Sequence, residues 1–193
     1  DIKNTKRIDS IFDDNKPDIV FHAAALKHVP IVEKNPLEGI LTNILGTINI
    51  AESCKKNNVA EMVLISTDKA VNPFSVMGVT KRISEKYCQS LAGSSQTNFK
   101  IVRFGNVLGS TGSVVPLFQK QLEKGGPLTV THPKMKRYFM TVREAVELVI
   151  QSATLENKTK KSGIFVLEMG QPIAIVEIAE QLIRLAGLRP NKD

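Results

Sequence analysis

The stretch "EMVLISTD", residues 61–68, decides the fold class. It has the length of a β-strand, its apolar residues follow one another without alternation, and it ends in hydroxyl and carboxylate side chains. An uninterrupted apolar run of this length is expected where a sheet is covered on both faces. The stretch therefore predicts a buried strand of a parallel sheet, with polar side chains at its carboxyl end.

Three further runs have the same character, and segments with helical spacing separate them. The runs are "DIVFHAAA" (18–25), "FKIVRFGN" (99–106) and "GIFVLEMG" (163–170), and apolar residues recur at helical intervals over 36–56 and 75–92. Further helices are predicted from the capping box "TVRE" (141–144) to about residue 155, and over about 176–186. Alternating strands and helices favour a parallel sheet with right-handed crossovers.

The carboxyl ends of parallel strands lie on one edge of a sheet, where ligands bind. The polar and small residues that follow the strands are therefore expected to converge there. They are His22 with Ala23 to Ala25, Thr67 to Lys69, and Gly105 with Asn106.

Composition narrows the classes of protein that remain. The 193 residues are 42% hydrophobic, enough for one domain with its own core, and 26 Lys and Arg against 19 Asp and Glu give a net charge of +7, which favours anionic partners. With two Tyr, no Trp and no interleaving of aromatic and basic residues, no nucleic-acid surface is expected. Without a long apolar run or a secretory signal, the sequence predicts a cytoplasmic chain. Cys54 and Cys88 lack metal-ligand spacing, so no metal site is predicted.

A glycine-rich turn, which normally opens a doubly wound nucleotide fold, is missing before Asp18. Either the fold is of another kind or the chain is a fragment. The predicted fold class is α/β: a partial Rossmann-like doubly wound parallel sheet without its N-terminal glycine-rich βαβ portion, and with a small substrate-binding part.

Six motifs carry a resemblance that spans nearly the whole chain. They are "FHAAALKHVP" (21–30), "TNILGTINI" (42–50), "STDKAVNP" (66–73), "VMGVTK" (76–81), "RFGNVLGSTGSVVP" (103–116) and "RYFMTVREA" (137–145). In this order they resemble the extended short-chain dehydrogenase/reductases, and within them the UDP-N-acetylglucosamine 4,6-dehydratases of polysaccharide biosynthesis, of the capsule and lipopolysaccharide type. The resemblance implies that the chain is truncated at both ends, beginning just after the glycine-rich turn.

The resemblance implies NAD or NADP as the cofactor. It assigns Asp1 and Ile2 to the adenine, Ala23, Ala24, Ala25 and Lys27 to the middle of the cofactor, and Lys81 to the nicotinamide ribose, with His22 and Asn43 as packing and ordering residues beside them. An alanine run lets a dinucleotide approach the backbone, although a tightly packed strand end would also suit alanines.

The resemblance also implies roles in catalysis. Thr67 binds the sugar's 4-oxygen, Asp68 is the acid and Lys69 the base of an elimination across C5 and C6. Such a pair needs an acid and a base held in different protonation states. Most members of the superfamily have tyrosine where Met77 stands, four residues before Lys81. We expect Met77 to form an apolar wall while the 4-hydroxyl proton leaves through Thr67 to Asp68 or Lys69, or through water; the alternative is a core methionine and lost catalysis.

Substrate recognition is expected from 107–140 and 170–193, within a single domain over 1–193. Asn106, Ser113 and Val114 are assigned to the UDP, and Arg137 to a phosphate oxygen. The superfamily pairs its subunits through helices that correspond to 36–56 and 75–92, so a homo-oligomer is expected. A membrane partner is expected only if a missing N-terminus carries spans.

The function implied is NAD(P)-dependent 4,6-dehydration of a UDP-N-acetylhexosamine, with UDP-N-acetylglucosamine as the expected substrate. The product would be a 4-keto-6-deoxy sugar nucleotide for surface polysaccharide. Two alternatives stay open: a nucleotide-sugar 4-epimerase on the same scaffold, and a non-catalytic truncated module. The adjacent Asp68 and Lys69 favour the dehydratase over the epimerase, which needs no acid and base at C5 and C6.

Overall fold

A computed structural model of the chain describes residues 1–155 and 162–190. Residues 191–193, at the end of the predicted substrate-facing portion, lie outside the described residues. The chain divides into two compact units: a first unit of Asp1–Phe104 with Leu148–Leu167, and a second unit of Gly105–Glu147 with Glu168–Asp193. The second unit covers most of the portion predicted to face the substrate; that role stays a prediction, as does the single domain.

The first unit is built on a four-stranded parallel sheet. Its strands are β1 (Ile19–His22), β2 (Glu61–Thr67), β3 (Asn98–Phe104) and β7 (Ser162–Val166), in the order β1-β2-β3-β7. The parallel sheet predicted from the apolar runs is thus confirmed. The predicted runs end later than the strands, because the small and polar residues after each strand leave the sheet as loops.

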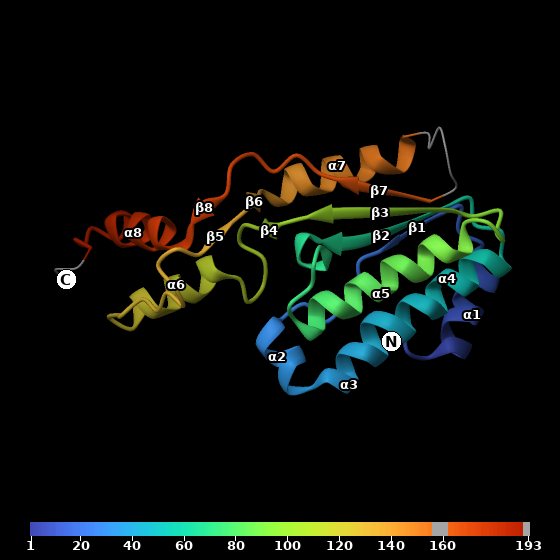
Figure 1. Cartoon of the computed structure of the whole chain (residues 1–193), viewed down its shortest axis with the longest axis horizontal. Coiled ribbons are helices and arrows are strands. Elements are labelled where there is room, and N and C mark those ends of the chain that lie inside the picture. Colours follow the sequence, from blue (N-terminus) through green and yellow to red (C-terminus); the bar gives the residue numbers. More distant parts are fainter. Residues whose placement is uncertain (156–161, 191–193) are drawn as a thin grey trace. The chain divides into compact units, whose positions relative to one another are not determined.

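Helices cover both faces of this sheet (Figure 1). α1 (Thr5–Asn15), α4 (Gly46–Lys56) and α5 (Val76–Leu91) lie on one face, and the C-terminal half of α7 (Val142–Thr154) lies on the other. The core beneath the first three helices contains Ile8, Phe12, Ile50, Ala51, Cys54, Val59, Met62, Leu64, Cys88, Leu91, Phe99 and Ile101. Coverage on both faces explains why the strands are apolar on successive residues.

The sequence interpretation missed α1 and α2 (Val29–Lys34). α1 begins after Asn4, whose side chain accepts a hydrogen bond from the Arg7 backbone N–H, and it buries only Ile8 and Phe12. α2 is six residues long and buries only Val32. Each of these two helices contributes only one or two residues to the core.

The segment 36–56, predicted as one helix, is helical throughout but not uniform. It consists of α3 (Pro36–Gly39), a π-helical turn η1 (Ile40–Leu45) and α4. A π-helical turn accommodates an extra residue and often lies at a functional site. Asn43, one of the predicted site residues, is fully buried within it.

The second unit has its own small core. Phe118 of α6 (Val114–Glu123) packs with Ile175, Ile178 and Ala179 of α8 (Ile175–Leu185). Two short strand pairs complete it: β4 (Asn106–Val107) with β6 (Phe139–Met140), and β5 (Lys136–Arg137) with β8 (Ile173–Ala174). The sequence interpretation missed α6, because the Gly- and Ser-rich residues before it and the Gly and Pro after it suggest a connection without secondary structure.

The predicted capping box at the start of α7 is confirmed. The Thr141 backbone N–H and hydroxyl both donate to the Glu144 carboxylate, at 2.7 and 2.8 Å, and the Glu144 N–H donates back to the Thr141 hydroxyl at 3.2 Å. None of the helices within 1–155 and 162–190 combines the length and apolar character that a membrane span needs.

Candidate active site

The predicted triplet lies where β2 leaves the sheet. Thr67 is the last residue of β2, and Asp68 and Lys69 begin the 3-10 turn η2 (Asp68–Ala70). The Thr67 hydroxyl and the Lys69 ammonium donate hydrogen bonds to the same oxygen, Asp68 Oδ1, at 2.8 and 2.9 Å. The three side chains therefore form one hydrogen-bonded group.

Asp68 and Lys69 form an ion pair that water reaches. Their side chains are 25% and 29% exposed. The role expected from the sequence, with Asp68 as the acid and Lys69 as the base, requires the proton to be on Asp68 and not on Lys69 when elimination begins. The hydrogen bond between them is the path along which protonation can be redistributed.

α5 packs directly on the backbone of this triplet. The Ser75 hydroxyl caps the helix by accepting a hydrogen bond from the Gly78 N–H at 3.1 Å. A Cβ added at Gly78 would overlap the carbonyl oxygen of Lys69 and would lie 3.1 Å from Pro73 Cβ. Glycine is required here by close approach, so the first turn of α5 lies against η2.

Met77 and Lys81 lie on this part of α5, at positions i and i+4, and both are buried. Among the residues that the structure describes, no hydrogen-bond acceptor contacts the Lys81 ammonium. Burial lowers the pKa of Lys81 to about 8, and the negative charge of Glu85 opposes that shift. The ammonium has hydrogen bonds to donate, and the hydroxyls of a nicotinamide ribose can accept them.

His22 lies at the end of β1 and is held as a neutral side chain. Its Nε2 is 2.9 Å from the Thr47 hydroxyl, which donates to the Asn43 carbonyl oxygen at 2.6 Å, so His22 Nε2 is the donor of that pair. Burial, followed by the positive charge of Lys81, lowers the pKa of His22 to about 4. His22 is therefore uncharged near neutral pH, and the charge of Lys81 contributes to that by lowering the pKa of His22.

Asn43 joins the loop after β1 to α5. Its Oδ1 accepts from the Leu26 N–H at 2.7 Å, and its Nδ2 donates to the Leu26 carbonyl at 3.0 Å and to the Thr80 hydroxyl at 2.9 Å. All three contacts depend on the side-chain amide. The buried amide thus fixes the position of the loop between β1 and α2 relative to α5.

The other predicted cofactor residues lie on the surface or near it. Ala23, Ala24 and Lys27 are exposed and Ala25 is half-buried in the loop that follows β1. Exposed alanines at a strand end leave the backbone open to a ligand, which fits the assigned dinucleotide. Asp1 is exposed and accepts a hydrogen bond from the Lys3 N–H at 2.9 Å, while Ile2 packs on Gly46 of α4.

The four predicted substrate residues all belong to the second unit. Asn106 pairs with Phe139 in β4, Ser113 and Val114 open α6, and the Arg137 guanidinium donates to the Lys136 carbonyl at 2.8 Å. The Ser113 hydroxyl oxygen is buried and has no hydrogen-bond partner within the described ranges. The convergence of these residues with the triplet stays a prediction.

Two acidic residues beside the site were missed. Glu33 of α2 accepts a hydrogen bond from the Val76 N–H, at 2.7 Å, at the amino end of α5, where a carboxylate is favoured. Glu85 is fully buried one turn after Lys81. The spacing from Lys81 to Glu85 was visible in the sequence, but no local pattern links Glu33 to α5. Across the described part of the chain, no three His, Cys, Asp or Glu side chains gather as a metal site would require.

The parallel sheet, the triplet at the end of β2 and the buried methionine and lysine on α5 define a Rossmann-like fold of the extended short-chain dehydrogenase/reductase type. The chain belongs to the family described as polysaccharide biosynthesis protein, whose sequence model matches residues 1–193.

Curated relatives of this chain carry more than one activity in their names. The chain is 56% identical to the capsular polysaccharide biosynthesis protein CapD of Staphylococcus aureus over 97% of its length and 31% of the relative. It is 41% identical to the inverting UDP-N-acetylglucosamine 4,6-dehydratase of Campylobacter jejuni, over 79% of this chain and 46% of the relative. It is 44% identical to the UDP-glucose 4-epimerase of Rickettsia canadensis, over 78% and 44%. The chain spans about a third to a half of the length of these relatives.

Solved structures show the same fold. Pen from Bacillus thuringiensis matches with a TM-score of 0.89 and 37% identity, over 98% of this chain and 58% of that one. The UDP-glucose 4-epimerase of Thermus thermophilus, solved as a complex with NAD, matches with a TM-score of 0.87 and 22% identity, over 98% and 68%. At that identity the likeness shows the fold alone.

Proposed function

We propose that the protein catalyses NAD(P)-dependent 4,6-dehydration of a UDP-N-acetylhexosamine, with UDP-N-acetylglucosamine as the substrate. The observation that carries this proposal is the Thr67–Asp68–Lys69 group, hydrogen-bonded through Asp68 Oδ1 and packed against α5 at Gly78. The 4,6-dehydratase relative from Campylobacter jejuni and the capsule-biosynthesis relative support it.

The residues beside the triplet fit NAD or NADP. The exposed Ala23 and Ala24 leave room for a dinucleotide, and the buried ammonium of Lys81 offers hydrogen bonds to ribose hydroxyls. When bound, the nicotinamide accepts hydride from C4 of the sugar and returns it to C6. The neutral His22 adds no second positive charge beside Lys81, whose own charge favours the ribose hydroxyls as acceptors.

The triplet can remove the 4-hydroxyl proton without a tyrosine. The Thr67 hydroxyl accepts that proton and passes its own to Asp68 Oδ1, with which it is already hydrogen-bonded at 2.8 Å. Asp68 then holds the acid proton that the elimination needs. Met77 has no proton to give or take, and in its buried place it occupies the volume of the missing phenol.

Protonation of Asp68 also prepares the base. The carboxylate charge that holds the Lys69 ammonium is lost, so Lys69 releases a proton to the water that reaches its side chain. Neutral Lys69 takes the proton from C5 while Asp68 protonates the leaving C6 hydroxyl, and water departs. Lys69 then returns its proton to C5 as hydride reaches C6. Lys69 finally takes back from water the proton that it released at the start, so one water is lost and both side chains are restored.

The experiment follows the product by mass spectrometry. The protein, expressed from its whole reading frame, is incubated with UDP-N-acetylglucosamine and NAD or NADP. Loss of one water, with one deuterium at C5 when the reaction runs in D2O, supports the dehydratase. The variant Lys69→Met should lower turnover by a factor of about 10²–10⁴, while Met77→Leu should keep near-normal turnover. An unchanged mass and no bound cofactor would contradict the proposal.

A 4-epimerase is the second candidate, because the relative from Rickettsia canadensis is named as one. It would return hydride to C4 and leave Asp68 and Lys69 without a role at C5 and C6. The same assay distinguishes the two, since an epimerase gives an isomer of unchanged mass that retains the C5 hydrogen.

We further propose that two copies pair through 36–56 and α5. Apolar side chains on these helices are exposed: Leu37 at 62%, Ile40 at 44%, Val79 at 40% and Ile83 at 44%. α3, η1 and α5 contact one another within the first unit, so these residues belong to neighbouring helices. A second copy of the same surface would bury them.

A further inference from the structure

Glu85 is a fully buried carboxylate outside the residues assigned to the chemistry. Its Oε1 accepts hydrogen bonds from the Ser66 hydroxyl at 2.5 Å and from Arg103 Nε at 2.8 Å. Its Oε2 accepts from Arg103 Nη2 at 2.5 Å and from Arg82 Nη1 at 3.3 Å. Burial alone would raise the pKa of Glu85, but these hydrogen bonds and the charge of Arg103 outweigh it and hold the pKa below its ordinary value.

The partners of Glu85 lie at the ends of the strands that carry the site. Ser66 immediately precedes Thr67, and it is the register partner of Arg103 in the pairing of β2 with β3. Glu85 itself lies at i+4 from Lys81, on the same side of α5. One carboxylate therefore fixes α5 to two neighbouring strands at their carboxyl ends.

Stability does not explain this arrangement. A buried ion pair is often no more stabilising than apolar side chains of the same volume, because its desolvation cancels much of its attraction. What the carboxylate adds is a fixed orientation, through a two-point contact with Arg103, and a fixed negative charge one turn from Lys81.

The negative charge of Glu85 matters because few other negative charges lie near the Lys81 ammonium. Titratable and charged groups on α5 near Lys81, and on the elements packed around this part of the helix, include Arg82, Glu85, Cys88, His22, Glu33, Lys34, Glu38, Cys54, Asp68, Lys69 and Arg103. Burial lowers the pKa of Lys81 to about 8, and Glu85 is the largest influence that raises it. Glu33 accepts a hydrogen bond at the amino end of α5, and Asp68 is paired with Lys69.

We propose that Glu85 is a positioning residue of this site, which keeps Lys81 in its ammonium form and fixes the start of the Thr67–Lys69 triplet relative to α5. The charge effect on Lys81 does not depend on which sugar nucleotide reacts. The consequence for catalysis rests on the proposed function.

The test is a titration of Lys81 in the whole protein, without substrate. Lysine labelled with 13C and 15N is followed by NMR, and the Lys81 signal is assigned by its loss in Lys81→Arg. In Glu85→Gln the amide keeps an acceptor for Ser66 but loses the charge, so we expect the Lys81 midpoint to fall by about one pH unit. Glu61→Gln is the matched control: Glu61 pairs with the buried Lys100 at 3.2 Å near the start of β2, far along the strand from the site. It should leave the Lys81 midpoint unchanged.

A second variant covers the case in which Glu85→Gln does not fold, since it leaves Arg103 unpaired. Glu85→Gln with Arg103→Gln removes both charges and is expected to fold with a lowered Lys81 midpoint, because Glu85, and not Arg103, is a charge that acts on the pKa of Lys81. An unchanged Lys81 midpoint in a folded variant overturns the proposal. If the midpoint falls while the protein never dehydrates UDP-N-acetylglucosamine, the proposed function fails and the assignment of Glu85 stands. If both hold, turnover near pH 7 should fall about twofold, since about half of Lys81 would then be neutral, and should recover at lower pH.

Discussion

The backbone of Gly78 lies against the carbonyl oxygen of Lys69, so closely that a Cβ at position 78 would overlap that oxygen. This contact joins the first turn of α5 to the turn η2. It sets how near the buried Met77 and Lys81 lie to the ion pair of Asp68 and Lys69. A methyl group at one glycine would thus act on the whole candidate site.

Gly78→Ala should separate α5 from η2. Forcing a methyl group against a backbone oxygen costs about 1–3 kcal/mol of unfolding free energy, and displacing catalytic groups by about 1 Å lowers turnover roughly 100-fold. Urea unfolding and steady-state assays measure the two effects. Gly93→Ala is the control, because nothing lies within 4 Å of a Cβ there. Equal behaviour of the two variants would show that the contact has no such role.

Asn43→Ala should loosen the loop after β1. It leaves the N–H and carbonyl of Leu26 and the hydroxyl of Thr80 without their shared partner, at a cost of about 3 kcal/mol. Hydrogen exchange of the Leu26 amide should accelerate, and cofactor affinity should fall. Asn15→Ala serves as the control, since its amide contacts one carbonyl on an exposed helix end. Unchanged protection of Leu26 would argue against the clamp.

His22 should make the fold sensitive to mild acid. Its pKa is lowered to about 4 in the folded protein from 6.5, so between these pH values the unfolded chain binds one more proton. Stability is therefore lost as the pH falls from 6.5 toward 4, by about 1.4 kcal/mol per pH unit. His22→Gln should flatten this slope in urea unfolding measured from pH 7 to pH 5.

His132 provides the comparison for that measurement, because its exposed side chain gives up little solvation on folding. His132→Gln should leave the slope as it is in the unaltered protein. If His22→Gln also leaves it unchanged, burial of His22 does not set the acid sensitivity.

Ile83→Asp should break the proposed pairing of two copies. Ile83 is 44% exposed on α5, and a carboxylate there would face its equivalent in an isologous interface. Light scattering after size-exclusion chromatography should give a dimer for the unaltered protein and a monomer for the variant. Leu185→Asp, at a residue 84% exposed on α8, is the control and should remain dimeric. A monomer before any substitution would refute the pairing.

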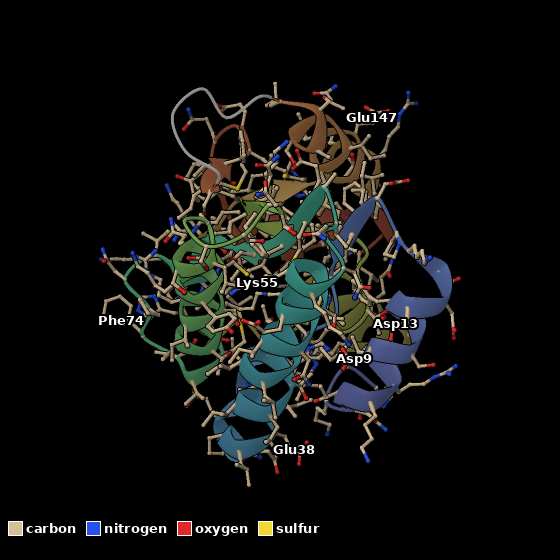
Figure 2. The ribbon with its side chains drawn as sticks, turned by 90° about the vertical axis from the view of Figure 1, so that its right-hand side faces the viewer. Asp9, Asp13, Glu38, Lys55, Phe74 and Glu147 are labelled. Atoms are coloured by element: carbon tan, nitrogen blue, oxygen red, sulfur yellow. The ribbon has the colours of Figure 1, made fainter. Side chains whose placement is uncertain are left out.

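Phe74 is a further apolar residue near this surface. It is fully exposed on the loop before α5, and Figure 2 shows it pointing away from that helix. Its removal by Phe74→Ser should leave the unfolding free energy within about 0.5 kcal/mol, since an exposed side chain loses no packing. A loss of dimer in this variant would extend the proposed interface to the loop.

The sequence was sufficient for the elements that bury many residues. β2 and α5 were visible as an apolar run and a helical period, because each contributes several side chains to the core. α1 and α6 were not predicted. α1 buries two residues, and α6 buries only Phe118 completely. The π-helical turn at 40–45 was not predicted, because its apolar residues have the same helical spacing as those of the helices on either side.

The candidate site divides in the same way. Thr67, Asp68 and Lys69 are adjacent in sequence, so their proximity could be predicted, as could the common face of Met77 and Lys81. The protonation states of these side chains could not be predicted, because the Asp68–Lys69 contact and the burial of Lys81 are properties of the folded state. Glu33 reaches α5 only through the packing of α2, which no sequence pattern encodes.

The π-helical turn also constrains how the chain can change in length. Before the turn, Gly39 lies against Val32 of α2 and near Thr80 of α5. After it, residues such as Ala51 and Cys54 face the core. The added residue of a π-helical turn rotates α4 relative to α3 by about 100° about the helix axis. Deleting one residue between 40 and 45 would remove this rotation, and either α3 or α4 would then turn away from the residues it contacts. Homologues that keep both contacts should therefore tolerate insertions on either flank of residues 36–56 but preserve the number of residues between Gly39 and Gly46.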